Sequence, residues 1–315
     1  MTNNGETKLK QALIVAQLYY EENLSQAAIA KKMKLSRPTI SRLLQLARES
    51  GLVKIEIENP FINYSDLTNV LAQRYHAQIK IVPSHYAGQQ TSLDSVGAYA
   101  ASFLTNLVKP NDIIGIGWGK TIHAVTTNLT EQTIPGVKTV QLKGGFSFNH
   151  EKTYAYESIN ELAQAFQTRA QYLPLPTIFD SKTTKELVEQ DRFIKQILDL
   201  GQKANIALFT VGSTNNNSLL FNLGYLTKAQ KNEIQAKAVG DVVSRFIDSD
   251  GQIIDQELNE RTIGIEVQAL GQKESSIVVA SGLRKTAAVH AVLKARYANI
   301  AIIDATLAQS LIDYE

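Results

Sequence analysis

The 315-residue sequence predicts an α/β protein in two parts, a small helical head and a larger, mostly parallel α/β body. In the first 58 residues, short amphipathic helices precede one strand with alternating apolar and charged residues. From residue 76 onward, short apolar runs alternate with amphipathic helices, as is typical of a parallel sheet covered on both faces. We therefore expect a head at residues 1–58, a linker and connecting helix at 59–75, and a body at 76–315.

The head contains two short helical patterns joined by a tight turn. Gln26–Met33 has apolar residues at helical spacing, and Lys34 and Leu35 follow as the turn. Ser36 then stands where an N-cap belongs, and Pro38 lies in the first turn, where its missing N–H costs nothing. The second helix ends at Gly51, and its expected inward stripe is Ile40, Leu43, Leu44 and Ala47.

This helix pair fits two interpretations, and the residues on either side of it decide between them. One interpretation is an ordinary helical hairpin with a solvated charged face, and the other is a helix-turn-helix. Here a preceding helix at Lys8–Asn23 is expected to turn Leu9, Leu13, Ala16 and Tyr20 inward. The alternating residues Leu52–Ile57 suit a wing strand. Three helices and a wing predict a winged helix-turn-helix, whose last helix enters the DNA major groove.

On that geometry, several residues with hydroxyl or basic groups would face double-stranded DNA. They are Ser36, Arg37, Thr39, Ser41 and Arg42 at the start of the second helix, with Lys54 in the wing. Arginine binds guanine edges, and hydroxyls suit bases or phosphates. Residues 1–58 carry a net charge of +3 and the remainder −1, so only the head has the mild basic excess that favours DNA.

Composition excludes several other chemistries. There is no cysteine, which rules out disulfides, thiolate zinc sites and cysteine nucleophiles. The five histidines are scattered without ligand spacing, so we expect no metal and no cofactor. No apolar signal core opens the chain, and no apolar run approaches the roughly 20 residues of a membrane span. We expect a soluble, cytoplasmic protein.

The order of elements in the body follows the same patterns. Strands are expected to end near residues 116, 142, 211 and 280, each before a helix or a glycine. Further expectations are continuous strands at 239–247 and 262–267 and a single helix at 182–200. In open parallel sheets, ligands bind where strands end and helices begin.

Two of these strand ends suggest an anion site. The run Gly117, Trp118, Gly119, Lys120 and Thr121 could bring backbone N–H groups to an anion, with a charge and a hydroxyl beside them. It could also be only a tight strand-to-helix turn. Arg284 and Lys285 stand in the first turn of a later helix, where a cation opposes the helix dipole. A bound phosphate would relieve that conflict, although the pair could also be merely solvated.

Lysine at a third strand end is unusual, because burial disfavours its charge. Lys143 and Gly144 directly follow the predicted strand 138–142. The lysine could reach solvent, pair with a carboxylate, bind phosphate, or form a Schiff base with an aldehyde. Gly212 and Asp241 end further apolar runs, and the carboxylate could accept hydrogen bonds from sugar hydroxyls. Together these positions suggest a small phosphorylated ligand with hydroxyl groups.

The order of these motifs resembles the SorC family of bacterial transcriptional regulators. The motifs are SRPTISRLL, GWGKT, VQLKGG, NIALFTVGS, AVGDVVSRF and SGLRKTAAVHAVL followed by YANIAIID, so that the resemblance spans nearly the whole chain. Family members join a DNA-binding head to a sugar-phosphate-sensing body. That body is similar to sugar-phosphate isomerases and glucosamine-phosphate deaminases.

Within the family, VQLKGG, YLPLP, NIALFTVG, AVGD and RTIGIE resemble regulators of deoxyribonucleoside uptake and breakdown in Gram-positive bacteria. Such regulators repress their genes and are released by deoxyribose 5-phosphate. The resemblance implies that Lys143 forms a Schiff base with the open-chain aldehyde and that Asp241 holds a hydroxyl. The residues it implies for the phosphate are Gly119, Lys120, Thr121, Arg284 and Lys285. Relatives tend to have a second threonine where this chain has Lys120.

Two other functions stay open at this point. The same regulator could sense a different sugar phosphate. The body could instead be an isomerase or aldolase with an accessory DNA-binding head, since fold does not decide function. A Schiff base alone captures an aldehyde, whereas turnover also needs a positioned acid and base. We therefore expect a non-enzymatic repressor, acting as a dimer or tetramer on operator DNA.

Overall fold

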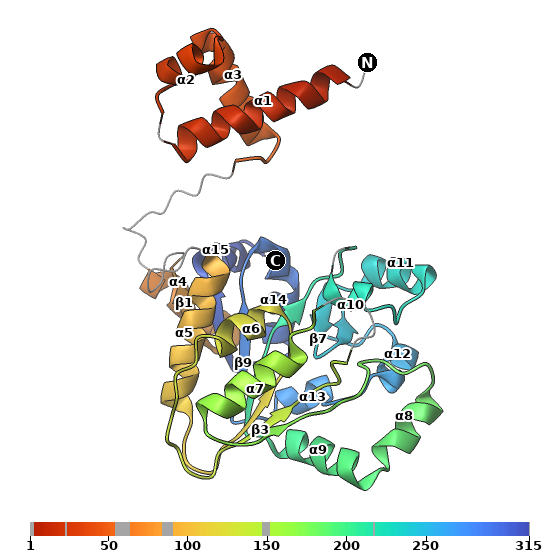
Figure 1. Cartoon of the computed structure of the whole chain (residues 1–315). Helices are drawn as coiled ribbons and strands as arrows, with labels where there is room; N and C mark the ends of the chain where they lie inside the picture. The colour runs from red at the N-terminus through yellow and green to blue at the C-terminus, as the bar shows by residue number, and fades with distance from the viewer. Residues whose placement is uncertain are drawn as a thin grey trace. The chain divides into compact units, whose positions relative to one another are not determined.

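The computed structural model describes residues 3–22, 24–53, 64–83, 91–146, 152–216 and 218–314. By internal contacts the chain divides into residues 1–62 and 63–315, for which we keep the names head and body (Figure 1). The helix that the sequence placed in the connecting segment, α4 (Tyr64–Tyr75), belongs to the body, because Leu71 and Tyr75 are buried in its core. Within the described ranges, no helix is long and apolar enough to cross a membrane.

The head contains the predicted helix-turn-helix. Its helices are α1 (Asn3–Tyr20), α2 (Gln26–Met33) and α3 (Arg37–Glu49). The Ser25 hydroxyl caps α2 by accepting from the Ala28 N–H at 3.2 Å. Lys34 ends α2 in the left-handed conformation, with φ of 54°. The Ser36 hydroxyl caps α3 by accepting from the Thr39 N–H at 3.3 Å, which confirms the predicted cap.

The inward face of α3 is as predicted, whereas on α1 only Ala16 of the four predicted residues is buried. Ile40, Leu43, Leu44 and Ala47 are buried in the head's core. On α1 the buried residues are Ala12, Val15, Ala16 and Leu18, whereas Leu9, Leu13 and Tyr20 are exposed. The helix carries two overlapping apolar stripes, and packing against α3 selects the one centred on Ala12 and Val15. The predicted wing lies outside the described residues from position 54 onward.

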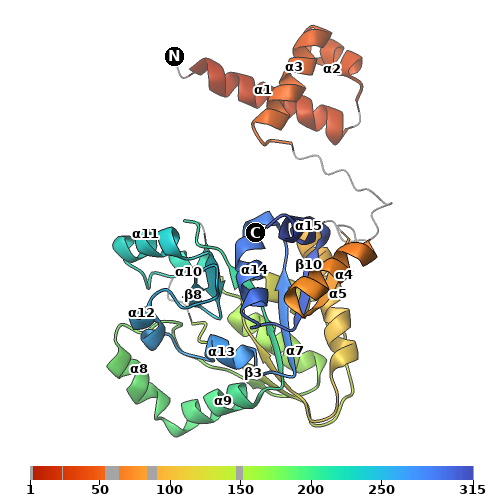
Figure 2. The same cartoon turned by 180° about the vertical axis from the view of Figure 1, so that it is seen from behind.

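A seven-stranded parallel sheet forms the centre of the body (Figures 1 and 2). Its strands, in spatial order, are β1 (Gln78–Val82), β10 (Ile300–Asp304), β9 (Ser275–Ala280), β5 (Ile206–Phe209), β2 (Ile113–Ile116), β3 (Lys138–Gln141) and β4 (Ala170–Gln171). Each neighbouring pair runs in the same direction. The prediction of a mostly parallel sheet is therefore confirmed.

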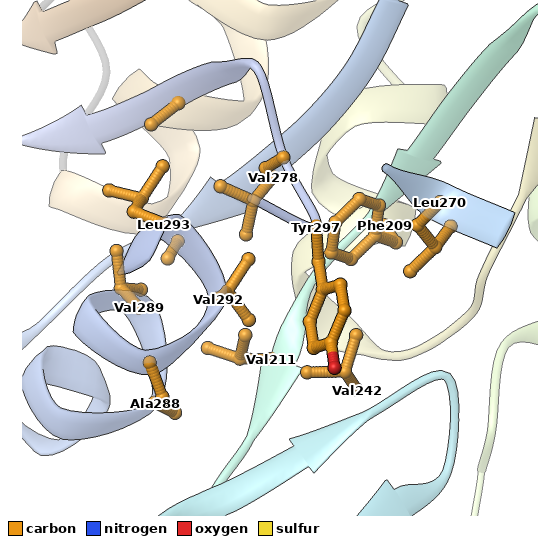
Figure 3. Packing of buried hydrophobic residues seen from close by; sticks show 14 of the residues in the cluster. Phe209, Val211, Val242, Leu270, Val278, Ala288, Val289, Val292, Leu293 and Tyr297 are labelled. Atoms are coloured by element: carbon orange, nitrogen blue, oxygen red, sulfur yellow. The ribbon is translucent and has the colours of Figure 1, made fainter. Parts of the chain in front are cut away.

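Helices cover both faces of this sheet. Ile277 and Val279 of β9 lie in a cluster with α5 (Ser92–Leu107), α6 (Lys120–Thr126) and α7 (Ala155–Ala165). Val278 and Ala280 point the other way, into a cluster with α4, α14 (Thr286–Lys294) and α15 (Ala305–Ile312). Figure 3 shows Val289, Val292 and Leu293 of α14 packed beside Val278. Burial on both faces explains why the central strands are apolar throughout.

A small antiparallel sheet and several short helices complete the body. The sheet consists of β6 (Val211–Gly212), β7 (Gly240–Val242) and β8 (Arg245–Ile247). The remaining helices are α8 (Lys182–Glu189), α9 (Arg192–Lys203), α10 (Leu219–Asn222), α11 (Lys228–Lys237), α12 (Gln256–Arg261), α13 (Val267–Leu270) and the 3₁₀ helix η2 (Leu283–Lys285).

Three expectations about these outer elements are wrong. The helix expected at 182–200 is split, because Asp191 caps a new helix by accepting from the Phe193 and Ile194 N–H groups. The stretch 239–247 is not one strand but a hairpin, in which Val243 and Ser244 adopt positive φ of 43° and 69°. The stretch 262–267 makes only isolated bridges, such as that of Gly264 to Lys143.

Candidate functional site

A pocket of about 690 Å³ lies at the carboxyl edge of the central sheet. Strands β9, β5, β2 and β3 are neighbours and parallel, so the residues after their ends come together there. The predicted residues that line the pocket are Trp118, Gly119, Lys120, Thr121, Lys143, Gly212, Asp241 and Lys285. Sequence reasoning missed the polar lining residues Lys152, Tyr154, Thr210 and Ser218.

Three predicted residues are not part of the lining. Arg284 is exposed on η2, outside the pocket, because the 3₁₀ turn directs Lys285 inward instead. Gly144 and Gly117 belong to the supporting structure. The Gly144 carbonyl accepts a hydrogen bond from Trp118 Nε1 at 2.8 Å and another from the Thr177 hydroxyl at 2.8 Å. The Gly117 N–H donates to the Leu208 carbonyl at 2.9 Å and so joins β2 to β5.

Lys143 is almost fully buried, with 6% of its surface exposed. Its amine donates a hydrogen bond to the Ser244 hydroxyl at 2.9 Å and lies 3.7 Å from the centre of the Trp118 ring. Burial lowers the pKa of this lysine to about 8, with Asp241 opposing the effect and Arg245 adding to it. A considerable fraction of the amine is therefore neutral near neutral pH, which an ordinary lysine is not.

Asp241 lies between two lysines. It pairs with Gly212 across β6 and β7, and it accepts the Ser244 N–H at 3.2 Å. Burial raises the pKa of this carboxyl, while Lys143, the Ser244 N–H and Lys285 lower it. A carboxyl in this setting can exchange a proton with a neighbouring amine or accept a hydrogen bond from a hydroxyl.

Lys285 is a second lysine of the pocket lining. Its amine donates to the hydroxyls of Thr121 and Thr210, both at 2.9 Å. Burial lowers its pKa to about 8, against the attraction of Asp241 and Asp304. Two hydroxyls are weak partners for a partly buried ammonium, so an anionic group that approached Lys285 would find an incompletely neutralised charge.

The loop after β2 also lines the pocket, and its Thr121 contacts Lys285. Gly119 has φ of 120°, a conformation that side chains rarely adopt, and it precedes α6 without a side-chain cap. Lys120 is exposed at the pocket rim, and Lys152 also lines the pocket. Among the described lining residues, four lysines thus accompany one carboxylate, a charge balance that favours an anionic ligand.

A second cavity of about 710 Å³ lies away from these strand ends. It is lined by residues of β3, β4, α9 and the loop before β4, and its basic residues Lys138 and Arg169 are exposed. None of the predicted site residues reaches it. In the described residues, no group of three or more His, Asp or Glu could hold a metal ion.

The predicted DNA-binding residues lie at the start of α3. Arg37, Ser41 and Arg42 are exposed there. Ser36 and Thr39 are already engaged, because their hydroxyls lie 2.7 Å apart and Ser36 caps the helix. The exposed arginines are therefore better placed for base contacts than the two hydroxyls. Lys54 lies outside the described residues.

Comparisons with known proteins agree with this architecture. A family model described as "Putative sugar-binding domain" matches residues 59–313, and a MarR-family model matches residues 7–60. The chain is 42% identical over 310 residues to the deoxyribonucleoside regulator of Bacillus subtilis strain 168, covering 97% of this chain and 98% of that one. It is 28% identical over 316 residues to the sorbitol operon regulator of Klebsiella pneumoniae, covering 99% and 100%.

Solved structures show the same fold. The crystal structure of the full-length sorbitol operon regulator SorC from Klebsiella pneumoniae gives a TM-score of 0.71 at 25% identity, covering 96% of this chain and 99% of that one. A domain of a possible sugar-binding transcriptional regulator from Arthrobacter aurescens TC1 gives a TM-score of 0.73 at 31% identity, covering 82% and 100%.

Proposed function

This chain belongs to the SorC family of bacterial transcriptional regulators, and we propose that it represses deoxyribonucleoside uptake and breakdown genes until deoxyribose 5-phosphate releases it from its operator. It is a sugar-responsive regulator with an N-terminal helix-turn-helix and a mostly parallel α/β body. Four parts of this function are proposals: the identity of the sugar, its covalent bond to the protein, repression as the direction of regulation, and the oligomeric state. The likeness of the body to sugar-phosphate isomerases and deaminases stays a prediction.

The observation that carries the proposal is the buried amine of Lys143 at the bottom of a cationic pocket. With a pKa of about 8, roughly a quarter of this amine is neutral at pH 7.5, against about a thousandth for an ordinary lysine. The neutral nitrogen adds to the aldehyde carbon of the open-chain sugar, and the carbonyl oxygen takes up a proton. Loss of that oxygen as water then leaves the imine. Asp241, the pocket carboxyl whose charge acts on Lys143, would supply and receive the protons through an intervening water or a ligand hydroxyl.

The phosphate end of the ligand would lie against Lys285. The hydroxyls of Thr121 and Thr210 already position this amine, and Lys120 lies at the rim of the same pocket. Burial lowers the pKa of both Lys143 and Lys285 to about 8, so their contacts distinguish them. We assign the aldehyde to Lys143, which lies beside one hydroxyl and the Trp118 ring, and the dianion to Lys285, which two hydroxyls hold. Deoxyribose 5-phosphate has both groups, which is why we prefer it to an uncharged or ring-locked sugar.

Replacing Lys285 tests the phosphate assignment. We expect Lys285→Met to weaken binding of deoxyribose 5-phosphate by about 100-fold, because it removes a buried charge-assisted contact. Binding of unphosphorylated deoxyribose should change little. Isothermal titration with both sugars measures the difference. Arg284→Ala is the matched control, since Arg284 is adjacent but exposed. Equal losses for both sugars would contradict the assignment.

For a bound sugar to release the DNA, binding in the pocket must change the conformation of the chain near the linker. Helix α14 begins directly after Lys285, and its His290 Nδ1 lies 2.8 Å from the Tyr75 hydroxyl. Tyr75 is the last residue of α4, the first helix after the linker. Arg74 also donates to the Leu311 carbonyl at 2.8 Å and so holds α4 to α15. We propose that α14 transmits occupancy from the pocket to α4.

Tyr75→Phe tests this route, because it removes the hydroxyl and keeps the ring. We expect sugar affinity to stay within about twofold and the sugar-induced loss of operator affinity to shrink about fivefold. Fluorescence anisotropy of labelled operator, with and without deoxyribose 5-phosphate, measures both. Tyr297→Phe is the control, since it also removes one buried hydroxyl, which donates to the Gly251 carbonyl at 2.8 Å. A full response in Tyr75→Phe would exclude the route.

An enzyme remains the second candidate, since an imine and a nearby carboxyl also occur in aldolases. The relatives described above are regulators, and we propose that this chain captures the sugar without turning it over. Stoichiometric binding without cleavage or isomerisation of deoxyribose 5-phosphate, followed by NMR, is the expected result. Catalytic disappearance of the sugar would favour the enzyme.

A further inference from the structure

Behind the pocket lies a fully buried guanidinium. The Arg245 side chain is 0% exposed and forms a two-point ion pair with Glu266, with Nε 3.0 Å from Oε2 and Nη2 2.9 Å from Oε1. Arg245 itself does not line the pocket. Burying a charge is expensive unless every donor is satisfied, so its other contacts are informative.

The remaining donors of Arg245 bind backbone carbonyls from two segments. Nη1 donates to the Val243 carbonyl at 3.2 Å, in the turn of the β7–β8 hairpin. Nη2 donates to the carbonyls of Thr262 and Gly264 at 3.4 and 3.2 Å. One side chain therefore holds the hairpin turn against the extended segment 262–266.

Both of these segments contact Lys143. In the turn, the left-handed conformations of Val243 and Ser244 place the Ser244 hydroxyl 2.9 Å from the lysine amine. A positive φ is unfavourable for a β-branched residue such as valine, so the turn needs outside support. In the extended segment, Gly264 pairs with the Lys143 backbone, and the Ile265 N–H donates to the Leu142 carbonyl at 2.8 Å. At Gly264 a Cβ atom would lie 2.4 Å from that carbonyl oxygen.

We propose that Arg245 and Ser244 are positioning residues for the Lys143 amine: Arg245 fixes the hairpin turn beside the strand end, and Ser244 orients the nitrogen toward the pocket. The inference rests on the proposed function, because orientation of the amine matters to a ligand only if the amine reacts with it. Neither residue stood out in the sequence, where both lay inside an expected strand.

The charge of Arg245 has a second effect on the same amine. Arg245 adds to burial in lowering the pKa of Lys143, whereas Asp241 raises it. The other charged groups around the pocket are Lys120, Lys152 and Lys285, and Glu266 is paired with Arg245 itself. Loss of the Arg245 charge and loss of its support for the fold would both raise the pKa of Lys143, so Arg245→Lys, which keeps the charge without the two-point ion pair, distinguishes the two roles.

The test uses the full chain and compares Arg245→Gln, Arg245→Lys and Ser244→Ala with the wild type. Trace acetylation over a range of pH, followed by peptide mass spectrometry, gives the reactivity profile of each lysine without any sugar. Lys273 is the internal control, because burial lowers its pKa too but its amine donates to the Gly201 carbonyl, away from the pocket. In parallel, borohydride trapping measures how fast deoxyribose 5-phosphate forms the imine.

In the wild type we expect a Lys143 midpoint at about 8. Arg245→Gln should raise the Lys143 midpoint and leave that of Lys273 in place, since it removes a positive charge near Lys143 alone and leaves Glu266 unpaired. Arg245→Lys keeps that charge and should restore the midpoint. Ser244→Ala should slow imine formation about tenfold with folding retained, because the nitrogen loses its orienting partner.

Two results would contradict the proposal. A wild-type Lys143 profile in folded Arg245→Gln, or a wild-type trapping rate in Ser244→Ala, would overturn the corresponding half of the inference. Should Arg245→Gln not fold, Arg245→Lys and Ser244→Ala still decide. Lysine keeps the charge but cannot make the two-point ion pair with Glu266, so the trapping rate must fall in both variants. The Lys143 acetylation profile of the wild type could have its midpoint at about 8 while borohydride traps no imine with deoxyribose 5-phosphate. In that case the proposed ligand is wrong, and the positioning role is tested by the acetylation profiles alone.

Discussion

Lys143→Ala should bind operator DNA as tightly as the wild type and remain bound when deoxyribose 5-phosphate is added. The substitution removes the nitrogen that forms the imine, while the head, a separate unit of the chain, stays unaltered. We expect release to require at least about a hundredfold more sugar phosphate than in the wild type, since the coupling between sugar and DNA depends on that bond. Anisotropy of an operator duplex, selected from a random library with the wild-type chain, measures the release.

Two further variants control this experiment. Lys143→Arg keeps a cation in the pocket but cannot form an imine, so it should fail to respond as Lys143→Ala does. Lys273→Ala removes a different buried lysine outside the pocket and should respond normally. Release of Lys143→Arg at wild-type sugar concentrations would show that charge, and not the covalent bond, carries the signal.

The second large effect is expected in the head. Arg37→Ala and Arg42→Ala should each weaken operator binding by about 10- to 100-fold, the loss expected for an arginine that contacts a base edge in two places. Both side chains are exposed at the start of α3, and α3 is held by the Ser36 cap at that end. The binding of deoxyribose 5-phosphate to the body should be unchanged in both variants.

Arg48→Ala is the matched control for the head. Arg48 is an exposed arginine of the same helix, but it lies in the last turn, far along α3 from the expected groove contacts. It should lose less than about threefold in affinity, as expected for a general phosphate attraction that salt weakens. Equal losses from all three arginines would mean that α3 contributes only nonspecific charge, and that other residues read the operator.

The parts of the fold that follow from local pattern could be predicted from the sequence. The central strands are apolar along their whole length because helices cover both faces, and this pattern is visible in the chain. Strand ends are equally visible, which is why Lys143, Thr121 and Asp241 could be named before their geometry was known. Parallel pairing then brings these ends together without any further information.

The remainder depends on contacts between distant segments. The stretch around Val243 has the composition of a strand, and its hairpin turn is supported by contacts with distant residues, among them the hydrogen bonds of Arg245 to residues 262–266. Because Ser244 owes its place to that turn, no local signal could identify it as the partner of Lys143. Similarly, α1 offers two apolar stripes, and only α3 determines which one is buried.

Neighbouring basic residues pose the same difficulty at η2. Arg284 and Lys285 looked equivalent in the sequence, yet the 3₁₀ turn exposes the first and directs the second between two threonine hydroxyls. Residue type indicated that an anion site was plausible here, but backbone conformation decides which cation reaches it. The prediction for Lys285→Met depends on this distinction.

The claim at the centre of this account is that Lys143 captures an aldehyde. Its most direct test is the intact mass of the full chain after borohydride reduction with deoxyribose 5-phosphate, for the wild type, Lys143→Ala and Lys273→Ala. We expect one adduct, with the mass of the sugar phosphate less one water plus two hydrogens, on the wild type and Lys273→Ala but not on Lys143→Ala. An unmodified wild type, or an adduct that persists in Lys143→Ala, would contradict it.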